Sequence, residues 1–361
     1  MMYFTKFVSV GRLRMLVGER GITQLYTTHN QSKRLLSNMS KPKIFCTRAD
    51  VPVEGLQILK NECSLSIWPE NFPATREALL KGVQNVDGIF CTLSDKIDKD
   101  VLDSAGTNLK VIGTMSVGFE HIDIDECKRR NIRVGYTPEV LTDATAELTV
   151  ALLLATSRRL IEANKQVFNG GWKSWAPTWM CGPGLKNATV GIVGFGRIAQ
   201  QVARIIKGFK PKKIIFQNRS EKAEEAKEIG AQRVTFDELL NASDFVICLC
   251  SLTPETKGLF NADAFRKMKS NAIFINVSRG QIVDQDALLE ALENKTIRAA
   301  GLDVTTPEPL PLDSPLLKLQ NCIILPHIGS AAIETRTEMC IMTAHNILAG
   351  LQGREMIAEL K

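Results

Sequence analysis

Residues 189–200 read TVGIVGFGRIAQ, and this stretch decides the fold. An apolar run leads into Gly194, and a run with helical character follows Gly196 and includes Ala199. The spacing is the G-x-G-x-x-G/A pattern in its required setting between a strand and a helix. Gly194 permits a tight turn, Gly196 lets the backbone approach a pyrophosphate, and Ala199 allows the helix to lie close to the strand. The stretch therefore predicts the βα unit of a dinucleotide-binding domain.

The first turn of the predicted helix supplies the phosphate contacts. The backbone amides of Arg197 and Ile198 would face the phosphates, with the positive end of the helix dipole behind them. A short G-x-G pattern is weak evidence alone, because many tight βα turns share it. The strand, turn and helix setting makes the dinucleotide interpretation the stronger one.

The next strand end indicates which dinucleotide is bound. An NAD site usually carries an acidic residue about 20 residues after the glycines, where it accepts the ribose hydroxyls. Residues 214–222 read IIFQNRSEK and offer Asn218, Arg219, Ser220 and Lys222 there instead. Arg219 can hold a 2′-phosphate by charge-assisted hydrogen bonds, with Ser220 donating and Lys222 adding charge. We predict NADPH (NADP) in preference to NADH; the alternative is an ordinary charged surface turn.

Strand-like runs alternate with amphipathic segments on both sides of this unit, which is typical of an α/β fold with parallel strands. Six runs predict one doubly wound sheet, at residues 189–193, 213–216, 244–249, 272–277, 299–304 and 322–326. Four earlier runs predict a second sheet, at residues 43–47, 86–91, 110–114 and 132–136. We expect two doubly wound parallel-sheet domains, a Rossmann coenzyme domain and a flavodoxin-like substrate domain.

The order of these segments predicts a discontinuous domain. The expected parts are a basic leader at 1–40, a dinucleotide-binding domain at 141–331, and a substrate-binding domain formed by 41–140 and 332–361. Thr142 and Asp143 are expected to cap the helix that follows the first crossing, in which Leu148, Leu152 and Leu153 share a face. A ligand site is expected in the cleft at the carboxyl ends of the strands.

Composition excludes several classes of partner. No run approaches the roughly 18 apolar residues that a membrane helix needs, so we expect no membrane partner. The formal charge of +6 comes mostly from residues 1–40, which leaves the rest near +1 and gives no reason to expect nucleic acid. The nine cysteines are scattered without a CxxC pair, so we expect reduced thiols, no metal site and an intracellular protein.

The leader is rich in Arg and hydroxyl residues and nearly free of acids, which is the composition of a mitochondrial transit peptide. The alternatives are a disordered tail or an untranslated leader, because Met39 begins MSKPKIFCTR just before the first predicted strand. The sequence therefore predicts a mitochondrial protein, a cytoplasmic one starting at Met39, or both.

Reactive side chains follow three of the predicted strands. His327 ends one strand, Arg279 follows another, and Asp303 and Glu308 follow a third. Imidazole is the side chain best matched to proton donation near neutral pH. Three strand ends of one sheet would thus place a proton donor (His327), a cation (Arg279) and two carboxylates in one crevice. The remaining histidines are interpreted differently: His29 lies in the leader, His345 in a helical run, and His121 is expected to cap or orient a helix start.

Six stretches, in order along Lys43–Lys361, resemble one family. They are MSVGFEHID (115–123), YTPEVLTDATAE (136–147), GIVGFGRIA (191–199), FINVSRG (274–280), GLDVTTPEPLP (301–311) and LPHIGSA (325–331). The chain resembles the D-isomer-specific 2-hydroxyacid dehydrogenases, most closely the eukaryotic glyoxylate and hydroxypyruvate reductases. Six motifs in order are far more specific than any one of them. Ala199 departs from the third glycine, and the missing ribose acid puts NAD in doubt.

The resemblance implies roles for individual residues. Arg279 would bind the carboxylate and carbonyl oxygen of a 2-oxo acid, and His327, paired with Glu308, would donate a proton to that oxygen. Asp303 would lie near the nicotinamide. The implied substrate-binding residues are Val117, Gly118, Leu93, Ser94, Arg279, Asp303 and Trp175. The implied cofactor contacts, besides those above, are Ser251, Val277, Asp303, His327, Gly329 and Ser330.

The resemblance also implies a homodimer. Trp172, Trp175 and Trp179 have the spacing of a helical core stripe. In the family this segment lies near the dimer contact, so Trp175 would reach the partner's substrate pocket. Both interpretations remain open at this point.

The expected activity is the NADPH-dependent reduction of glyoxylate to glycolate and of hydroxypyruvate to D-glycerate. A phosphoglycerate or other D-2-hydroxyacid dehydrogenase is the first alternative. A phosphorylated substrate would call for a basic cluster near Val117, whereas MSVGFEHIDIDE is acidic. The second alternative is a dinucleotide-sensing, corepressor-like binding protein. Such proteins share the fold and the reacting groups.

Overall fold

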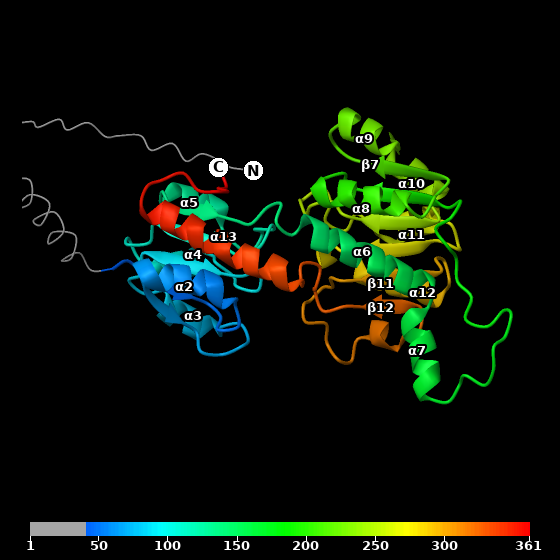
Figure 1. Ribbon diagram of the computed structural model, residues 1–361, viewed down its shortest axis with the longest axis horizontal. Helices are drawn as coiled ribbons and strands as arrows, with labels where there is room; N and C mark the ends of the chain where they lie inside the picture. The colour runs from blue at the N-terminus through cyan, green and yellow to red at the C-terminus, as the bar shows by residue number, and fades with distance from the viewer. Residues whose placement is uncertain (1–40) are drawn as a thin grey trace, which may run out of the picture. The chain divides into compact units, whose positions relative to one another are not determined.

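The computed structural model describes residues 41–361, which contain two parallel β-sheets (Figure 1). The predicted α/β fold class with two parallel sheets is confirmed. The leader, His29 and the alternative start at Met39 lie outside the described residues, so what was predicted for them stays a prediction.

The larger sheet has seven strands in the order β12-β11-β10-β9-β6-β7-β8. Their bounds are β6 Thr189–Val193, β7 Lys213–Gln217, β8 Ala231–Arg233, β9 Phe245–Cys248, β10 Ile273–Asn276, β11 Ala299–Leu302 and β12 Cys322–Ile324. All neighbours pair in parallel. The central strands are buried along their whole length, because helices cover both faces of a parallel sheet.

Helices cover this sheet on two sides, and two separate apolar cores result. One core joins the sheet to α6 Thr142–Ser157, α8 Arg197–Lys207 and α9 Ala223–Ile229. The other joins it to α10 Phe236–Ala242, α11 Ala262–Lys267 and α12 Gln285–Glu293. Two short 3₁₀ helices, η1 Gly280–Ile282 and η2 Pro315–Lys318, lie in the connections. The strands and helices therefore form a doubly wound unit.

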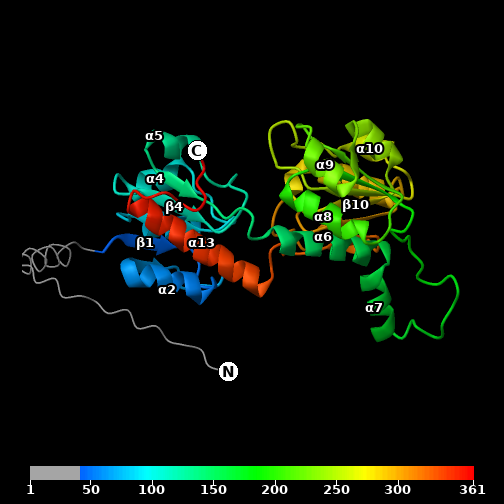
Figure 2. The same ribbon diagram turned by 45° about the horizontal axis from the view of Figure 1, so that its top comes forward.

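The smaller sheet has five strands in the order β2-β1-β3-β4-β5. The strands are β1 Lys43–Cys46, β2 Ser64–Ile67, β3 Gly88–Cys91, β4 Val111–Thr114 and β5 Arg133–Gly135. One core joins the sheet to α2 Val53–Glu62 and to the C-terminal helix α13 Ile333–Leu351. A second core joins it to α3 Arg76–Gly82, α4 Lys99–Ala105 and α5 Ile124–Arg129. Figures 1 and 2 both show α13, in red, beside α2, in blue, although the two are far apart in the sequence.

The prediction of four and six strands was wrong by one strand in each sheet. The missed strands, β2 and β8, are edge strands of four and three residues. Their sequences, SLSI and AQR, are largely polar and partly exposed, because an edge strand needs no continuous apolar run. Both extend their sheets without changing the predicted topology class.

The start of α6 also differs from the prediction. Leu141 is the N-cap residue and makes no side-chain cap hydrogen bond, while Thr142 and Asp143 lie inside the helix. Leu152 and Leu153 are buried as expected, and Leu148 is half-buried. The apolar face of the helix, rather than a polar cap, therefore fixes its position.

The tryptophan segment is not a helical core stripe. The helix α7 Leu160–Phe168 ends before it, and residues 170–184 contain no helix. Trp172 is 60% exposed, Trp175 82% and Trp179 41%. Glycines at 170 and 171 and prolines at 177 and 183 interrupt the segment and oppose a helix across the three tryptophans.

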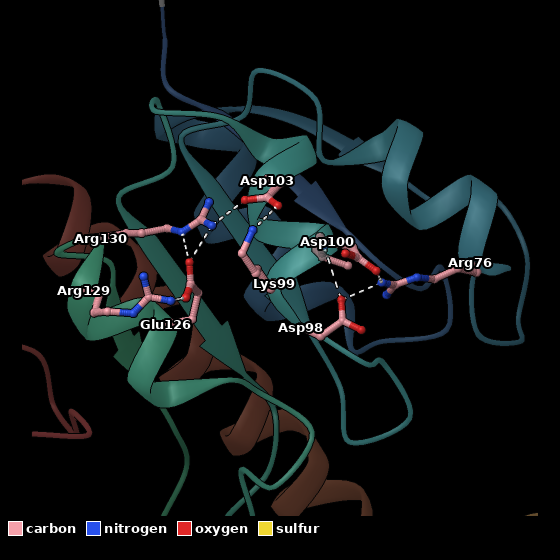
Figure 3. Close-up of polar contacts among 9 residues, drawn as sticks. Arg76, Asp98, Lys99, Asp100, Asp103, Glu126, Arg129 and Arg130 are labelled. Atoms are coloured by element: carbon pink, nitrogen blue, oxygen red, sulfur yellow. Dashed lines mark hydrogen bonds and ion pairs between the residues drawn. The ribbon is translucent and has the colours of Figure 1, made fainter.

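Two groups of ion pairs connect three helices that cover the smaller sheet (Figure 3). Asp98, the N-cap of α4, pairs with Arg76 of α3, and Asp103 of α4 pairs with Arg130 next to α5. Glu126 is buried and pairs with both Arg129 and Arg130. Because all partners except Glu126 are at least partly exposed, water and salt screen these pairs, and we expect each to contribute little to the stability of the fold.

The cysteines form no disulfide in the described residues, as the sequence predicted. Cysteines 46, 63, 91, 127, 181, 248, 250, 322 and 340 are all free thiols, and only Cys181 is exposed. No helix within residues 41–361 is long and apolar enough to cross a membrane.

Candidate functional site

The Gly-rich turn lies where the strand order of the larger sheet reverses. β6 begins this sheet, and its two neighbours, β7 and β9, lead away from it in opposite directions. A doubly wound sheet binds its ligand in the crevice at such a point. Gly194 has a φ of 87°, and a Cβ there would come within 2.6 Å of the backbone of Cys250. Only glycine therefore fits this turn.

The residues after the turn are suited to a pyrophosphate. Gly196 is the N-cap of α8 and makes no side-chain cap hydrogen bond, so the first amides of the helix face outward. A Cβ on Gly196 would meet no atom within 4 Å, so the space in front of the helix is clear for a phosphate group. The side chain of Arg197 is exposed and pairs with Glu139 at 3.0 Å, while its backbone amide belongs to the first turn of α8. Ala199 is buried against the sheet, as the motif requires.

The loop after β7 has a defined structure at the expected ribose position. Asn218 Oδ1 accepts the amide of Phe195 at 3.0 Å, and its Nδ2 donates to the hydroxyl of Ser220 at 2.9 Å. Arg219 and Ser220 are exposed, while Lys222 pairs with Glu225 at 3.1 Å. An amide therefore occupies the position of the usual acid, and the charge of Lys222 is partly neutralised.

The residues expected to contact the cofactor near the nicotinamide differ in how far their side chains are exposed. Ser251 is exposed after β9, whereas Val277 is only 8% exposed and belongs to the apolar core. Gly329 is buried and Ser330 is half-buried. Side-chain contacts from Ser251 and Ser330 are thus available, whereas Val277 offers little beyond its backbone.

His327 and Glu308 form a close pair. His327 Nδ1 lies 2.8 Å from Glu308 Oε2, and the amide of Thr305 donates to Glu308 Oε1 at 3.1 Å. Burial alone would raise the pKa of Glu308, but the hydrogen bond and charge of His327, followed by the Thr305 amide and the charge of Arg279, hold it below its usual value. Glu308 is therefore a carboxylate at neutral pH and holds the Nδ1 side of the imidazole.

Asp303 fixes the backbone that carries His327. Its Oδ1 accepts the amide of Ile328 and its Oδ2 accepts that of Gly329, each at 2.8 Å, while its carbonyl oxygen accepts the amide of His327 at 2.9 Å. Burial raises the pKa of Asp303, although the two amides oppose this. His327 has a φ of 56°, in the left-handed region, which costs backbone energy in a non-glycine residue. Asp303 thus stabilises the strained turn that aims the imidazole.

Arg279 contacts the loop that follows β4. Its guanidinium occupies the space that a Cβ on Gly118 would need, and its Nη2 lies 3.4 Å from Glu120 Oε2. Its Nη1 donates to the carbonyl of Ser278 at 2.8 Å. The loop itself is fixed, because the hydroxyl of Ser116 donates to the carbonyl of Gly118 at 2.7 Å. Arg279 and the MSVG loop are therefore neighbours in the structure.

Arg279, Glu308, His327 and Leu93 all line one cavity of about 310 Å³. They follow β10, β11, β12 and β3, so the cavity lies at carboxyl ends of strands. Among the predicted substrate residues, Val117, Gly118, Ser94, Asp303 and Trp175 do not line it. Gly118 is nonetheless in contact with Arg279, and Asp303 acts on His327 through the backbone. Trp175 remains exposed away from the cavity within this chain.

A comparison with known proteins decides the family. The chain is 53% identical over 321 residues to the human glyoxylate reductase/hydroxypyruvate reductase, which covers 88% of this chain and 98% of that protein. The chain belongs to the D-isomer-specific 2-hydroxyacid dehydrogenases. Residues 150–329 also match the model of the D-isomer specific 2-hydroxyacid dehydrogenase NAD binding domain. The larger sheet therefore belongs to a nicotinamide dinucleotide-binding domain.

Two solved structures share the whole fold of this 2-hydroxyacid dehydrogenase. A protein from Thermus thermophilus aligns with a TM-score of 0.82 and 40% identity, over 88% of this chain and 100% of that one. An NADPH-dependent glyoxylate/hydroxypyruvate reductase from Sinorhizobium meliloti, in complex with NADP and malonate, aligns with a TM-score of 0.77 and 28% identity, over 89% and 97% of the two chains.

Sequence reasoning missed several cavity residues of this 2-hydroxyacid dehydrogenase. Glu120, His121, Leu252, Gln281 and Thr305 line the cavity beside the predicted residues. Glu120 and His121 belong to the quoted motif MSVGFEHID, so their position after a predicted strand was an available signal. Thr305 likewise belongs to the quoted motif GLDVTTPEPLP, whereas Leu252 and Gln281 lie outside the six motifs.

A buried aspartate holds the loop that carries Leu93 and Ser94. Asp95 Oδ2 accepts the hydroxyl of Thr47 at 2.6 Å and the amide of Thr92 at 2.7 Å. Burial raises the pKa of Asp95, although these hydrogen bonds oppose it. Leu93 is therefore presented to the cavity on a loop that is tied to the end of β1.

The prediction that His121 caps or orients a helix start is wrong. Asp123 caps α5, accepting the amide of Glu126 at 2.9 Å, whereas His121 Nε2 lies 3.0 Å from the hydroxyl of Thr114. Burial lowers the pKa of His121 from 6.5 to about 4; Arg279 adds to the effect and Glu120 opposes it. His121 is thus a neutral hydrogen-bonding group at the cavity, not a second proton donor at neutral pH.

This shift predicts a pH dependence of stability. In the unfolded chain, His121 becomes protonated as the pH falls below about 6.5. In the folded chain, it becomes protonated only near pH 4. The free energy of unfolding should therefore fall by up to roughly 3 kcal/mol from this group between those pH values, and be unaffected above. Urea unfolding of the wild type and of His121→Gln, from pH 4 to pH 8, measures it. A difference between the two proteins that does not vary with pH contradicts the prediction.

Proposed function

We propose that this protein reduces glyoxylate to glycolate and hydroxypyruvate to D-glycerate with NADPH. The observation that carries the proposal is the His327 and Glu308 pair at 2.8 Å, which lines the same cavity as Arg279. A proton donor and a cation at one cavity are what the reduction of a 2-oxo acid needs. The 53% identity to the human glyoxylate reductase/hydroxypyruvate reductase supports this substrate class.

The proposed roles of the residues follow from their contacts. His327 uses Nδ1 for Glu308, so Nε2 is the ring nitrogen that can protonate the carbonyl oxygen of the substrate. Arg279 would bind the carboxylate with its guanidinium, and the backbone of Val117 and Gly118 would complete that side. Leu93 would cover the substrate. Asp303 would act through the turn of His327, because both of its carboxylate oxygens already accept backbone amides.

A bound dihydronicotinamide supplies the hydride in this chemistry. The chain's own part is to hold the phosphates at Gly196, Arg197 and Ile198, to orient the 2-oxo acid at Arg279, and to deliver the proton at His327. The carbonyl carbon receives hydride and the carbonyl oxygen receives the proton. The 2-oxo acid thus becomes a 2-hydroxy acid while NADPH becomes NADP.

The preference for NADPH rests on the loop after β7. Asn218 replaces the usual acid, and Arg219 and Ser220 are exposed where a 2′-phosphate would be expected. A phosphate monoester carries about −1.5 to −2 charges at pH 7, so a cation there favours it and a carboxylate would repel it. The Sinorhizobium meliloti relative, a complex with NADP, supports the proposal.

A matrix of four oxo acids against two cofactors tests the function. We expect glyoxylate and hydroxypyruvate with NADPH to give the highest kcat/KM, above pyruvate and phosphohydroxypyruvate. Glu120 at the cavity opposes a phosphorylated substrate. A preference for phosphohydroxypyruvate would assign the protein to the phosphoglycerate dehydrogenases. Binding of NADPH without turnover of any acid would favour the dinucleotide-sensing alternative.

Arg219→Ala tests the cofactor preference. The variant should raise the KM for NADPH about tenfold or more and leave the KM for NADH nearly unchanged, because only NADPH carries the 2′-phosphate. Steady-state kinetics with both cofactors measures this. Equal effects on the two would count against a phosphate contact at Arg219.

We propose that each sheet is the core of one domain. The larger sheet and its helices, residues 141–331, would bind the dinucleotide, and residues 41–140 with 332–361 would bind the substrate. The packing of α13 on α2 supports the return of the chain to the first domain. Leu93 would then contact the substrate from that domain, with Arg279 on the other.

We propose that the protein is a homodimer formed through α7 and the tryptophan segment. No residue of α7 is buried, and Phe168 is 81% exposed at its end, next to exposed Trp172 and Trp175. Exposed apolar side chains gathered in one stretch of the chain fit a second copy, and Trp175 would then reach the partner's cavity. Sedimentation velocity should show a dimer that Phe168→Asp converts to monomer; a wild-type monomer at micromolar concentration would refute it.

A further inference from the structure

A second arginine lies over the loop that follows β7. Arg233 is the last residue of the edge strand β8 and pairs in register with Phe216 of β7. Its Nη2 donates to the carbonyl oxygen of Asn218 at 3.0 Å and to that of Arg219 at 3.2 Å, and its Nε lies 3.3 Å from the first of these. The side chain is exposed. One guanidinium therefore holds two consecutive carbonyls of the loop.

This loop is held from two sides. Asn218 ties it to the Gly-rich turn through the amide of Phe195, and Arg233 ties it to the sheet edge. Asn218 also donates to the carbonyl and hydroxyl oxygens of Ser220, at 3.0 and 2.9 Å. The backbone that carries Arg219 and Ser220 is thus fixed before any ligand arrives, which lowers the entropy cost of binding.

The cations at this edge are not equivalent. Lys222 has Glu225 as an ion-pair partner. Within residues 41–361, neither Arg219 nor Arg233 has a carboxylate within 4.0 Å of its guanidinium. The hydrogen bonds of Arg233 go only to carbonyl oxygens and leave Nη1 without a hydrogen-bond partner in the described chain. Arg233 therefore keeps its full charge and at least one free donor nitrogen.

We propose that Arg233 is a second specificity-determining residue for the 2′-phosphate of NADPH. It masks the negative ends of the Asn218 and Arg219 carbonyls, which would otherwise repel an anion, and offers Nη1 and its charge to the phosphate. The inference rests on the proposed NADPH preference and extends it to a residue 14 positions beyond Arg219, at the end of β8. A guanidinium can do this because its fork holds two acceptors while a third nitrogen stays free.

Binding of two nucleotides without any turnover tests the inference. Adenosine 2′,5′-bisphosphate carries the 2′-phosphate and adenosine 5′-monophosphate lacks it, so calorimetry with both isolates the contact. Arg233→Met should weaken the bisphosphate about 10-fold and the monophosphate less than about 2-fold. Arg233→Lys keeps the positive charge but lacks the planar guanidinium, so its affinity for the bisphosphate should lie between those of the wild type and Arg233→Met. Arg204→Met is the matched control, because Arg204 is an exposed arginine of α8 that pairs with Glu228.

The outcomes separate the two proposals. A wild type that binds both nucleotides equally overturns the NADPH preference, and this inference with it. A wild type that favours the bisphosphate, with a preference that Arg233→Met leaves unchanged, overturns only the role of Arg233. Equal weakening of both nucleotides would show that Arg233 is a structural brace and would also overturn it. The ratio of kcat/KM for NADPH to that for NADH should follow the ratio of affinities across the variants.

Discussion

Replacing His327 with Ala is expected to lower kcat for hydroxypyruvate reduction about 100- to 10,000-fold while NADPH binding stays nearly unchanged. Within residues 41–361, the imidazole of His327 is the side chain that pairs with Glu308, through Nδ1 at 2.8 Å. His121, the other histidine at the cavity, has a pKa lowered to about 4 by burial and cannot replace it as a proton donor at neutral pH. Stopped-flow or steady-state reduction at pH 7 measures the loss.

His345→Ala serves as the control for His327→Ala. His345 is exposed on α13 and lines no part of the cavity, so its loss should change kcat by less than about twofold. NADPH titration by fluorescence would show whether the cofactor still binds to each variant. Normal turnover in a folded His327→Ala protein would eliminate His327 as the acid.

Gly118→Ala is expected to lower kcat/KM for hydroxypyruvate about 100-fold, mainly through KM. The guanidinium of Arg279 occupies the space that the new methyl group needs, so the arginine must move from the position where it would meet the substrate carboxylate. A displacement of about 1 Å in a positioning group can cost on the order of 100-fold. Initial rates over a range of hydroxypyruvate concentrations separate KM from kcat.

Gly184→Ala is the matched control for Gly118→Ala. A Cβ on Gly184 would meet no atom within 4 Å, so the same chemical change should leave both constants close to the wild type. A Gly118→Ala protein with the wild-type KM would show that Arg279 does not need its present place to bind the substrate.

The sequence predicts the elements of the fold that are buried on both faces, because burial requires apolar residues there. The central strands β6, β9 and β10 are buried along their length and therefore carry continuous apolar runs. The edge strands β2 and β8 carry no such run, because one side of an edge strand meets no neighbour. The prediction that Thr142 and Asp143 cap α6 was wrong. The helix begins after Leu141, which makes no side-chain cap hydrogen bond.

The site could be predicted where reactive residues follow strands, and not where tertiary contacts decide the role. His327, Glu308 and Arg279 share a cavity, as their strand ends indicated. His121 was misjudged because only the structure shows its burial and its contact with Thr114. Arg233 was missed because it is 15 residues from Asn218 along the chain and meets that loop only through strand pairing.

The contact between Arg279 and Glu120 has a consequence for substrate choice. The guanidinium already has a carboxylate 3.4 Å away, supplied by the chain itself. In the proposed role of Arg279, a 2-oxo acid would therefore exchange one anion for another, rather than neutralise a lone cation. A simple aldehyde or ketone brings no carboxylate to replace Glu120, so the proposed role of Arg279 would favour an acidic substrate over a neutral one.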